Sequence, residues 1–461
     1  MANKTGTVVY TQQRQALTLG KLIKSGGAGS VFLLVERPSE VAKLYHSDKD
    51  AALYERKLGA MLELRPDLPE VEDAGVLHVQ IAWPTGLLRD RSGSCIGFTM
   101  PILDVAATSD LEHVLQERQA REEALPTGLG PKMTLAANLS VMLAALHRRQ
   151  HYVVDLKPLN VRFYRRSLFI AMLDCDGFSI QGRSERFPAG QVTTDYLAPE
   201  FQQRGVKPGQ EEAQDCFALA VVLFQLLNSG LHPYSGRPKD SRLPSDLSGR
   251  IAAGLYPYGL HGNARIEPSQ SSGHTAFPEA LRAMFDRAFS TQAQQRPSAE
   301  DWAALLTGYA RRDSGALVAC TKDRAHQHFR ALPCAACARV ERLVQATRAT
   351  HGSRGNGGMH TASNTRRQRQ AATQVATPAS AAAAQPLGPV GMGSRVVVGV
   401  VGPLLLGWAM GWGMPAYRKF SAVEGLQWAK SLVLGFHGGL LLGAFVLFLL
   451  IVPTLILSPR K

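Results

Sequence analysis

The chain has 461 residues, 45% of them hydrophobic, and carries 51 Lys and Arg against 37 Asp and Glu, a formal net charge of +14. This length exceeds one small domain and is enough to bury a sizeable core, so at least two structural units are expected. Six scattered cysteines exclude a disulfide framework. The N-terminal residues before Gln15 contain no continuous apolar run and lack a secretory signal, which predicts a cytosolic N-terminal domain.

The N-terminal part of the chain predicts strands with one helix among them. Short β-branched and aliphatic runs are typical of strands. In the segment 50–64 the apolar residues Leu53, Leu58 and Met61 recur at helical spacing, and Pro66 and Pro69 end that pattern. The expected elements are a helix at 50–64 and strands at 17–23, 31–35, 41–45, 81–88 and 95–103.

Beyond residue 110 the pattern becomes mostly helical. The segments 135–147 and 216–227 are the strongest predicted helices, and both are apolar enough to be largely buried. The sequence therefore predicts an α+β fold in which a strand-rich part precedes a helical part.

Glycines gather between the first two predicted strands, in the segment 24–31. Gly26, Gly27 and Gly29 have no Cβ, so backbone N–H groups here can approach phosphate oxygens, and Val31 can pack over a base. A glycine-rich hairpin turn explains the same residues. No Gly-Lys-Ser/Thr opens a helix, which excludes the Walker type of phosphate loop.

Lys43 lies in a strand-like run, where an inward-pointing lysine needs an anionic partner. The phosphates of ATP and a glutamate on the following helix could supply it. Glu55, one turn before Leu58, is the predicted ion-pair partner, and Glu63 is the alternative. An exposed Lys43 with a solvated Glu55 is the competing interpretation.

The most specific pattern is at 152–160, which reads Tyr-Val-Val-Asp-Leu-Lys-Pro-Leu-Asn and is followed by an apolar strand and by Asp-Cys-Asp-Gly-Phe at 174–178. Here the chain resembles the protein kinase superfamily, whose catalytic loop reads His-Arg-Asp-Leu-Lys-Pro-x-Asn. The match runs from Asp155 through Asn160. The family's metal-binding Asp-Phe-Gly lies about a dozen residues further on, which places Asp174 at its aspartate.

The resemblance implies a two-lobed protein-kinase-like fold over residues 1–311, with an N-lobe at about 15–103 and a C-lobe at about 104–311. Asp155 would orient the attacking hydroxyl and accept its proton, and Lys157 would stabilise the transferred phosphate. Asn160 and Asp174 would supply oxygen ligands to Mg²⁺, and Lys43 would hold the α- and β-phosphates of ATP. The implied activity is phosphorylation of Ser or Thr in a protein substrate.

Further motifs extend the resemblance over residues 15–310. The segment 193–200 ends in Ala-Pro-Glu, like a kinase activation segment, and Asp215 occupies the place of the buried helix aspartate that braces the catalytic loop. Glu200 and Arg296 are implied to form a buried ion pair between distant segments. These positions favour a protein kinase over the small-molecule phosphotransferases.

Several residues depart from the family pattern. Lys24 stands where the phosphate loop has its first glycine, and Val153 and Val154 replace the His and Arg of the catalytic loop. Without that arginine, activation by phosphorylation of the activation segment is not expected. Asp176 stands at the glycine of Asp-Phe-Gly and would add a metal ligand or stiffen the loop, unless the metal motif begins at Asp176 itself. These departures motivate a second hypothesis, a pseudokinase or nucleotide-binding signalling scaffold.

A Cys/His segment follows at 312–345. Cys320, His326, Cys334 and Cys337 offer three thiolates and an imidazole, enough for a closed tetrahedral zinc site, with His328 as the alternative histidine. The set resembles a small cysteine–histidine knuckle found behind some bacterial kinase-like domains. Free thiols in a helical tail are the competing interpretation.

A basic linker is expected at 346–394. No acidic residue occurs between Glu341 and Glu424, and the arginines lie among Gly, Ser, Thr, Gln and Ala. This composition predicts a disordered linker, either drawn to an anionic membrane surface or acting as a solvated spacer. No base-stacking aromatics interleave the arginines, so nucleic acid is not an expected partner.

The C-terminal end carries two apolar stretches without charged residues, at 396–417 and 431–458. Each is long enough to cross a bilayer, which predicts a transmembrane hairpin at 395–458 embedded in membrane lipid. A buried soluble hairpin is the alternative. The distribution of basic residues and the need for ATP both place the kinase-like domain in the cytoplasm. The expectation is a cell-membrane protein with two helices.

Overall fold

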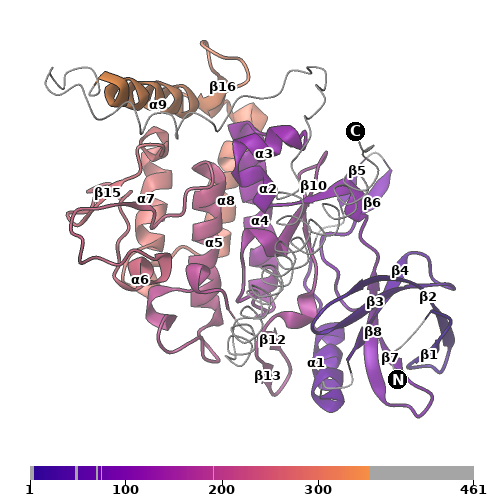
Figure 1. Ribbon diagram of the computed structural model, residues 1–461. Helices are drawn as coiled ribbons and strands as arrows, with labels where there is room; N and C mark the ends of the chain where they lie inside the picture. The colour runs from indigo at the N-terminus through magenta and orange to yellow at the C-terminus, as the bar shows by residue number, and fades with distance from the viewer. Residues whose placement is uncertain (1–4, 47–49, 69–70, 74, 191, 353–461) are drawn as a thin grey trace, which may run out of the picture. The chain divides into compact units, whose positions relative to one another are not determined.

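The computed structural model describes residues 5–46, 50–68, 71–73, 75–190 and 192–352, which belong to one compact unit (Figure 1). The predicted transmembrane hairpin and the part of the predicted linker from residue 353 onward lie outside the described residues. Within them the fold is mixed: strands dominate up to Pro101 and helices dominate afterwards.

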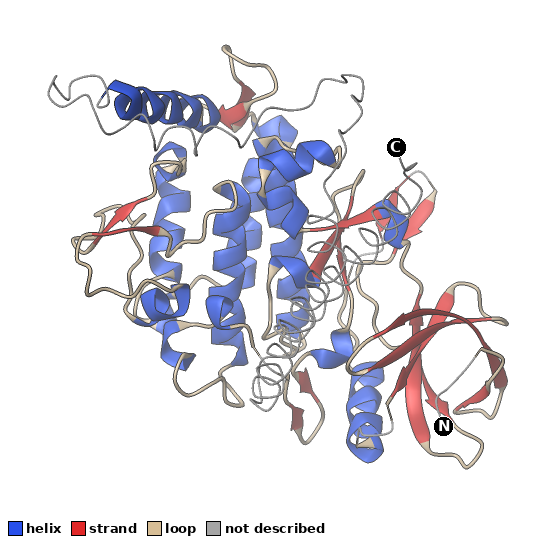
Figure 2. Ribbon diagram, viewed as in Figure 1, coloured by secondary structure: helices blue, strands red, loops and turns tan. Residues whose placement is uncertain are grey.

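The N-terminal strands close into a barrel in the order β1-β2-β3-β4-β8-β7, and the pairing of β1 with β7 completes the ring (Figure 2). Eight buried apolar side chains fill a cluster inside it, because alternate residues of a strand point to the same face. The strands are β1 (Val8–Thr11), β2 (Ala16–Ser25), β3 (Gly29–Leu34), β4 (Glu40–Tyr45), β7 (Gly86–Arg89) and β8 (Cys95–Pro101).

Two strand boundaries differ from the expectation. The strand-rich part begins with β1 at Val8, ahead of residue 15, because the short run before Thr11 pairs with both β2 and β7. The strand expected at 81–88 is reduced to β7. Pro84 lies inside the expected strand and has no N–H to donate to a ladder, and Ile81 forms only an isolated bridge with Met172.

Helix α1 (Ala51–Glu63) connects the barrel to the rest of the fold. Asp50 caps its N-terminus by accepting from the backbone N–H groups of two first-turn residues. Leu58 and Met61 are fully buried in the main core, as their helical spacing predicts. Trp83 is also fully buried and donates from Nε1 to the backbone oxygen of Met61 at 2.8 Å, which fixes the end of α1.

Long helices form the second part of the fold. The predicted helices at 135–147 and 216–227 lie within α4 (Leu129–Arg148) and α5 (Glu211–Leu227), whose side chains are mostly buried. In the described part of the chain α4 alone is long and apolar enough to cross a membrane, and 67% of its apolar window is buried inside the fold, as in the core helix of a soluble protein. The other helices are α2 (Glu112–Leu115), α3 (Glu117–Glu122), α6 (Leu247–Ala252), α7 (Glu279–Ala288) and α8 (Ala299–Ala310).

Short antiparallel sheets hold the loops between these helices. The sheet β9-β10-β11 places the loop before β10 and the segment after β11 at its ends. These strands are β9 (Thr108–Asp110), β10 (Val161–Tyr164), β11 (Ile170–Met172), β12 (Ile180–Gln181), β13 (Arg186–Phe187), β14 (Gly236–Pro238), β15 (Ile266–Pro268), β5 (Val71–Asp73) and β6 (Val76–His78).

The segment after α8 packs on the helical part. It consists of β16 (Leu317–Ala319), β17 (Gln327–Phe329) and α9 (Ala335–Gly352). Phe329 is buried in the main core against Phe277 and Tyr309. Helix α9 extends to Gly352, so the first residues of the predicted linker, 346–352, are helical.

Candidate functional site

The loop between α4 and β10 brings three of the predicted catalytic residues together. Asp155 accepts from Lys157 Nζ at 2.7 Å, and Asn160 Nδ2 donates to the Asp155 backbone oxygen at 2.9 Å. Thr193 completes the group: its N–H donates to Asp155 Oδ1 at 2.8 Å and its Oγ1 accepts from Lys157 at 2.6 Å. Thr193 was not among the predicted site residues. Among the described residues nothing donates to the Asn160 amide oxygen, so it can act as a ligand.

A buried carboxylate on α5 holds this loop in place. Asp215 is fully buried and accepts from the backbone N–H of Val153 at 2.8 Å and of Val154 at 2.7 Å. Val154 has a φ of 66°, a left-handed conformation that is strained for a β-branched residue. His147 Nε2 lies 3.1 Å from the same carboxylate. The predicted bracing role of Asp215 is confirmed, and the brace stabilises a backbone turn that the sequence disfavours.

Lys43 on β4 meets two carboxylates, and we call Lys43, Tyr45, Asp174 and Asp176 the Lys43 cluster. Lys43 Nζ lies 2.8 Å from Asp174 Oδ1 and 2.6 Å from Asp176 Oδ1. Tyr45 donates to the second oxygen of Asp176 at 3.2 Å. Burial alone would lower the pKa of Lys43. The charges of Asp176 and Asp174 raise it by more than burial lowers it, so the pKa of Lys43 lies above its usual value. Lys43 therefore stays charged.

The two aspartates differ in exposure, and this separates their roles. The Asp174 side chain is 68% exposed, whereas that of Asp176 is 4% exposed. Asp174 has a left-handed φ of 54°, which turns the chain so that both carboxylates reach one ammonium. Asp174 lines the cleft and is open to a metal ion, while Asp176 is a buried counterion of Lys43. The geometry thus favours Asp174 over the alternative register as the metal ligand.

The predicted Lys43–Glu55 ion pair is wrong. Glu55 pairs with Arg89 of β7, and the alternative, Glu63, pairs with Arg183. The residue of α1 that points toward the cluster is Lys57, which is buried and donates to the backbone oxygen of Phe178 at 2.7 Å. Burial lowers its pKa to about 8; the Asp176 charge raises it and the Lys43 charge lowers it. The counterions of Lys43 thus come from the segment after β11 and not from α1.

The glycines of the segment 24–31 differ in their surroundings: Gly29 is tightly packed, whereas Gly26 and Gly27 are not. A Cβ at Gly29 would lie 2.2 Å from the Leu44 backbone oxygen, so the close pairing of β3 with β4 requires glycine there. Gly26 and Gly27 have open space around them. The Gly26 N–H donates to the Gly29 backbone oxygen at 2.9 Å, which closes the turn. Val31 is partly buried against the main core. Gly29 therefore serves the sheet rather than a ligand.

A cleft of about 500 Å³ is bordered by Lys24, by the loop that contains Asp155 and Asn160, and by the segment that contains Asp174. Its lining includes Lys24, Asp155, Asn160 and Asp174, which places the three acidic and amide oxygen donors and one lysine around one space. Lys24 occupies the position that is glycine in the kinase pattern, and its charge helps to lower the pKa of Asp174. The donors are hard oxygens, the ligand type that Mg²⁺ prefers.

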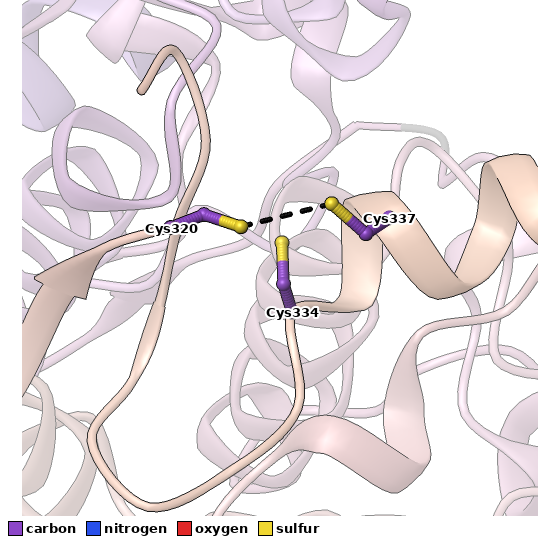
Figure 3. A group of neighbouring side chains, drawn as sticks. All are labelled: Cys320, Cys334 and Cys337. Carbon is purple, nitrogen blue, oxygen red and sulfur yellow. Dashed lines mark hydrogen bonds between the residues drawn. The ribbon is translucent and has the colours of Figure 1, made fainter. Parts of the chain in front are cut away.

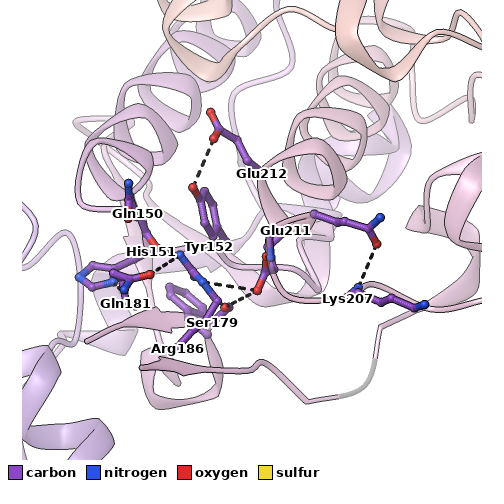
Figure 4. A network of polar contacts seen from close by, with 12 residues as sticks. Gln150, His151, Tyr152, Ser179, Gln181, Arg186, Lys207, Glu211 and Glu212 are labelled. Atoms are coloured by element: carbon purple, nitrogen blue, oxygen red, sulfur yellow. Dashed lines mark hydrogen bonds and ion pairs between the residues drawn. The ribbon is translucent and has the colours of Figure 1, made fainter. Parts of the chain in front are cut away.

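The segment after the Lys43 cluster is held by a network of hydrogen bonds and ion pairs (Figure 4). Arg186 donates to Ser179 Oγ at 3.0 Å and to the Gln150 backbone oxygen at 3.1 Å, and lies 3.7 Å from Glu211. Its guanidinium also stacks 4.9 Å from the ring of Tyr152. Arg186 thus links this segment to the end of the α4–β10 loop and to α5.

Further along, the predicted Glu200–Arg296 pair is confirmed. Arg296 is buried and bonds both carboxylate oxygens of Glu200, at 2.5 and 2.8 Å. The bidentate geometry gives a strong charge-assisted contact. It anchors the end of the segment 193–200 to the loop before α8.

The three cysteines of the predicted Cys/His set come together (Figure 3). The thiols of Cys320, Cys334 and Cys337 lie within 4.8 Å of one another, with 3.7 Å between Cys320 and Cys337. His326 Nδ1 lies 3.5 Å from Cys337 Sγ, whereas His328 is hydrogen-bonded to its neighbour's backbone oxygen. Tetrahedral zinc with Zn–S about 2.3 Å and Zn–N about 2.0 Å separates two sulfurs by about 3.8 Å and a sulfur from a nitrogen by about 3.5 Å. The three thiols are close enough together to hold a zinc ion. His326 is the histidine near them, through its 3.5 Å contact with Cys337.

Comparison with known proteins gives two curated relatives, both named Protein kinase YegI. The one from Escherichia coli (strain K12) is 29% identical over 310 residues, which is 66% of this chain and 46% of the relative. The one from Escherichia coli O157:H7 is 29% identical over 305 residues, 65% of this chain and 45% of the relative. The chain thus spans about half the length of the curated relatives that it matches. No family model matches the chain.

Proposed function

We propose that the chain is an ATP- and magnesium-dependent protein kinase that phosphorylates Ser or Thr of a protein substrate at the cytoplasmic face of a membrane. Its similarity to two curated protein kinases supports the kinase part of this proposal. The observation that carries the proposal is the group around Asp155. Its carboxylate is held by Lys157 and by the Thr193 N–H, at the rim of a cleft that also contains Asp174. Phosphoryl transfer needs such placement and charge compensation rather than covalent help.

The roles follow from the contacts. Asp155 can orient a substrate hydroxyl and accept its proton, and Lys157 bridges Asp155 and Thr193 where negative charge would develop. Asp174 and the free amide oxygen of Asn160 would hold magnesium, which neutralises phosphate charge when bound. Lys43 is charged and buried beside Asp174, and would pair with phosphate oxygens.

The test is a phosphate-transfer assay with the full-length chain, radiolabelled ATP and magnesium, using autophosphorylation and a Ser/Thr peptide mixture as acceptors. Wild type is expected to incorporate label on Ser or Thr. Asp155→Asn and Asp174→Ala should each lower the rate by about 10³-fold, because each removes a charge at the reacting groups. Asp240→Asn, at an exposed position paired with Arg242, is the matched control and should keep the wild-type rate.

Two outcomes would contradict the proposal. If Asp155→Asn transfers phosphate as fast as wild type, the observed activity does not use this site. If no transfer occurs at all but nucleotide raises the thermal midpoint, the scaffold hypothesis is favoured instead, because ligand binding alone stabilises a folded protein.

Membrane anchoring is proposed from the apolar stretches at 396–417 and 431–458. The full-length chain should remain in the membrane fraction after a carbonate wash, whereas a chain ending at residue 394 should be released. A cytoplasmic catalytic domain predicts that protease digests it only after the cytoplasmic face is opened. Release of the full-length chain by carbonate would contradict the anchor.

We propose that the Cys320–His326–Cys334–Cys337 cluster binds one zinc ion. The Cys320–Cys337 and Cys337–His326 distances, 3.7 and 3.5 Å, are those of neighbouring ligands in a tetrahedral site. Asp323 lies 3.4 Å from the other His326 nitrogen, where a carboxylate orients a ligating histidine. Elemental analysis should find one zinc per chain, and Cys337→Ser should lose it. His328→Ala should retain zinc, since His328 lies outside the cluster; loss of zinc in this variant would favour the other histidine.

A further inference from the structure

A second cavity, of about 410 Å³, lies between the helical part and the Cys/His segment. The first turn of α4, the end of α5 and the segment from Ala325 to Val340 line it. It shares no lining residue with the catalytic cleft. Its size is within the range of small-molecule sites.

Lys132 on α4 lines this cavity, and its environment is unusual. Lys132 is only 6% exposed. Its ammonium nevertheless has no hydrogen-bond or ion-pair partner among the described residues. The other two buried lysines in the described ranges are both partnered, Lys43 by two aspartates and Lys57 by the Phe178 backbone oxygen. A buried ammonium without a partner costs stability. Its position at a cavity points to an anion as the missing partner.

The charged side chains that line the cavity, other than Lys132, carry a net positive charge. Arg339 on α9 lines it and has no ion-pair partner in the part of the chain that the structure describes. Arg121 is paired with Glu117, so these two lining charges compensate each other. The N-terminus of α4 also faces the cavity and adds partial positive charge, although the Gly130 N–H is already bonded to Gln327 at 2.8 Å. Glu117 also lies close enough to Lys132 to raise its pKa, against the larger effect of burial, which lowers it. Lys132 and Arg339 are therefore the two cations of the wall that form no ion pair among the described residues.

The rest of the wall is mixed. Its apolar part includes Leu129, Leu227, Phe277, Phe329 and Val340, and its polar part includes Thr127, Asn228, Ser229, Ser271 and Gln327. A site with two cations and an apolar part of the wall fits a molecule that has one anionic group and an apolar body. The chain's own linker does not suit it, because no acidic residue occurs between Glu341 and Glu424.

We propose that this cavity binds a small soluble organic anion, a phosphate or carboxylate that carries an apolar body, with the anionic group on Lys132 and Arg339. Burial lowers the pKa of Lys132 to about 8, with Glu117 raising it and Arg339 lowering it, so the ammonium is still mostly charged at neutral pH. The site is separate from the nucleotide cleft, and the inference does not depend on catalysis.

The test is calorimetric titration of the full-length chain in nanodiscs of neutral lipid, with hexyl phosphate and hexanoate as probes. Saturating ADP and magnesium are present to occupy the nucleotide cleft. At least one probe should bind at one site per chain. Lys132→Met should weaken that binding at least about tenfold, because a charge-assisted hydrogen bond is lost, while Lys132→Arg should keep most of it. Lys239→Met, at an exposed lysine, is the matched control and should bind as wild type does.

A second measurement separates loss of the site from misfolding. Without probe, Lys132→Met should raise the thermal midpoint by about 2–4 °C, because it removes an unpaired buried charge. A lower midpoint would assign Lys132 a structural role and overturn the proposal. It is likewise overturned if neither anion binds below about 10 mM, if 1-hexanol binds as tightly as hexyl phosphate, or if binding is equal in Lys132→Met and wild type.

Discussion

The catalytic loop and the Lys43 cluster differ in how closely their charged residues follow the kinase pattern. Both hold a charged group in a fixed place beside the cleft. In the catalytic loop the residues that contact one another stand where the kinase pattern expects them, as with Asp155, Asn160 and the bracing Asp215. In the Lys43 cluster the charge is kept but its partner has moved from α1 to Asp176.

The difference shows what each region requires. A group that takes a proton or ligates a metal must present a particular atom at a particular point, so its backbone position is fixed. A counterion needs only to place negative charge near an ammonium, which several elements can do. On α1 the inward position is taken by Lys57, which instead bonds the segment after the cluster through Phe178. We expect mutations to separate the two regions accordingly.

The largest effect is expected at the brace of the catalytic loop. Asp215→Ala would leave the buried N–H groups of Val153 and Val154 without an acceptor, and the strained turn at Val154 without support. We expect the free energy of unfolding to fall by about 3–5 kcal/mol, measured by denaturant titration. Glu212→Ala, on the exposed side of the same helix, should cost about 1 kcal/mol or less. Equal losses in the two variants would show that the brace is not specific.

The next effect tests the relocated counterion. In Asp176→Asn, Lys43 would keep only Asp174 as its partner, and Asp174 would be drawn away from the cleft. We expect the transfer rate to fall by about 100-fold, which corresponds to about 2.7 kcal/mol of transition-state stabilisation. In Glu55→Gln the rate should stay near that of wild type, because Glu55 pairs with Arg89. The reverse ranking would restore the helix glutamate as the functional partner.

The family resemblance identified Asp155, Lys157 and Asn160, whose contacts with one another are local because they lie within six positions. The contact of Asp155 with Thr193, 38 positions away, was missed. The pair Glu200–Arg296 spans 96 positions and was available only through the family resemblance. The Lys43 cluster spans more than 130 positions and depends on a left-handed turn at Asp174, which spacing does not reveal.

The buried face of α1, next to the Lys43 cluster, could have been predicted from the sequence. Tyr54, Lys57, Leu58 and Met61 follow the i, i+3, i+4, i+7 spacing of a buried helix face, which places Lys57 inward and Glu55 to the side. The strand boundaries were harder, because Pro84 shortens one strand and the short β1 has too few residues to show alternation. The lack of a partner for Lys132 could not be predicted from the sequence, because it depends on how α9 and the cavity lie around Lys132.

A smaller effect is expected where the segment after the cluster is tied down. Arg186→Met would remove contacts to Ser179, to the Gln150 backbone oxygen and to Glu211. We expect the unfolding free energy to fall by about 1–2 kcal/mol, with faster hydrogen exchange in residues 179–187. Arg183→Met, which removes an exposed arginine of the same hairpin, is the matched control and should leave exchange unchanged. Unchanged exchange in Arg186→Met would show that other contacts order the segment.

The smallest effect concerns the pH dependence of stability through Lys57. Its pKa of about 8 in the folded protein lies below the roughly 10.4 of an exposed lysine, so the unfolded chain binds more protons between these values. The stability that Lys57 contributes therefore rises with pH in this window and is lost as pH falls through about 8. Between about pH 7 and pH 9 the unfolding free energy of wild type should rise by about 1 kcal/mol relative to that of Lys57→Met. Lys21→Met, at an exposed lysine, should follow wild type across the same range, and a parallel profile for Lys57→Met would mean that Lys57 is charged and solvated rather than buried beside the cluster.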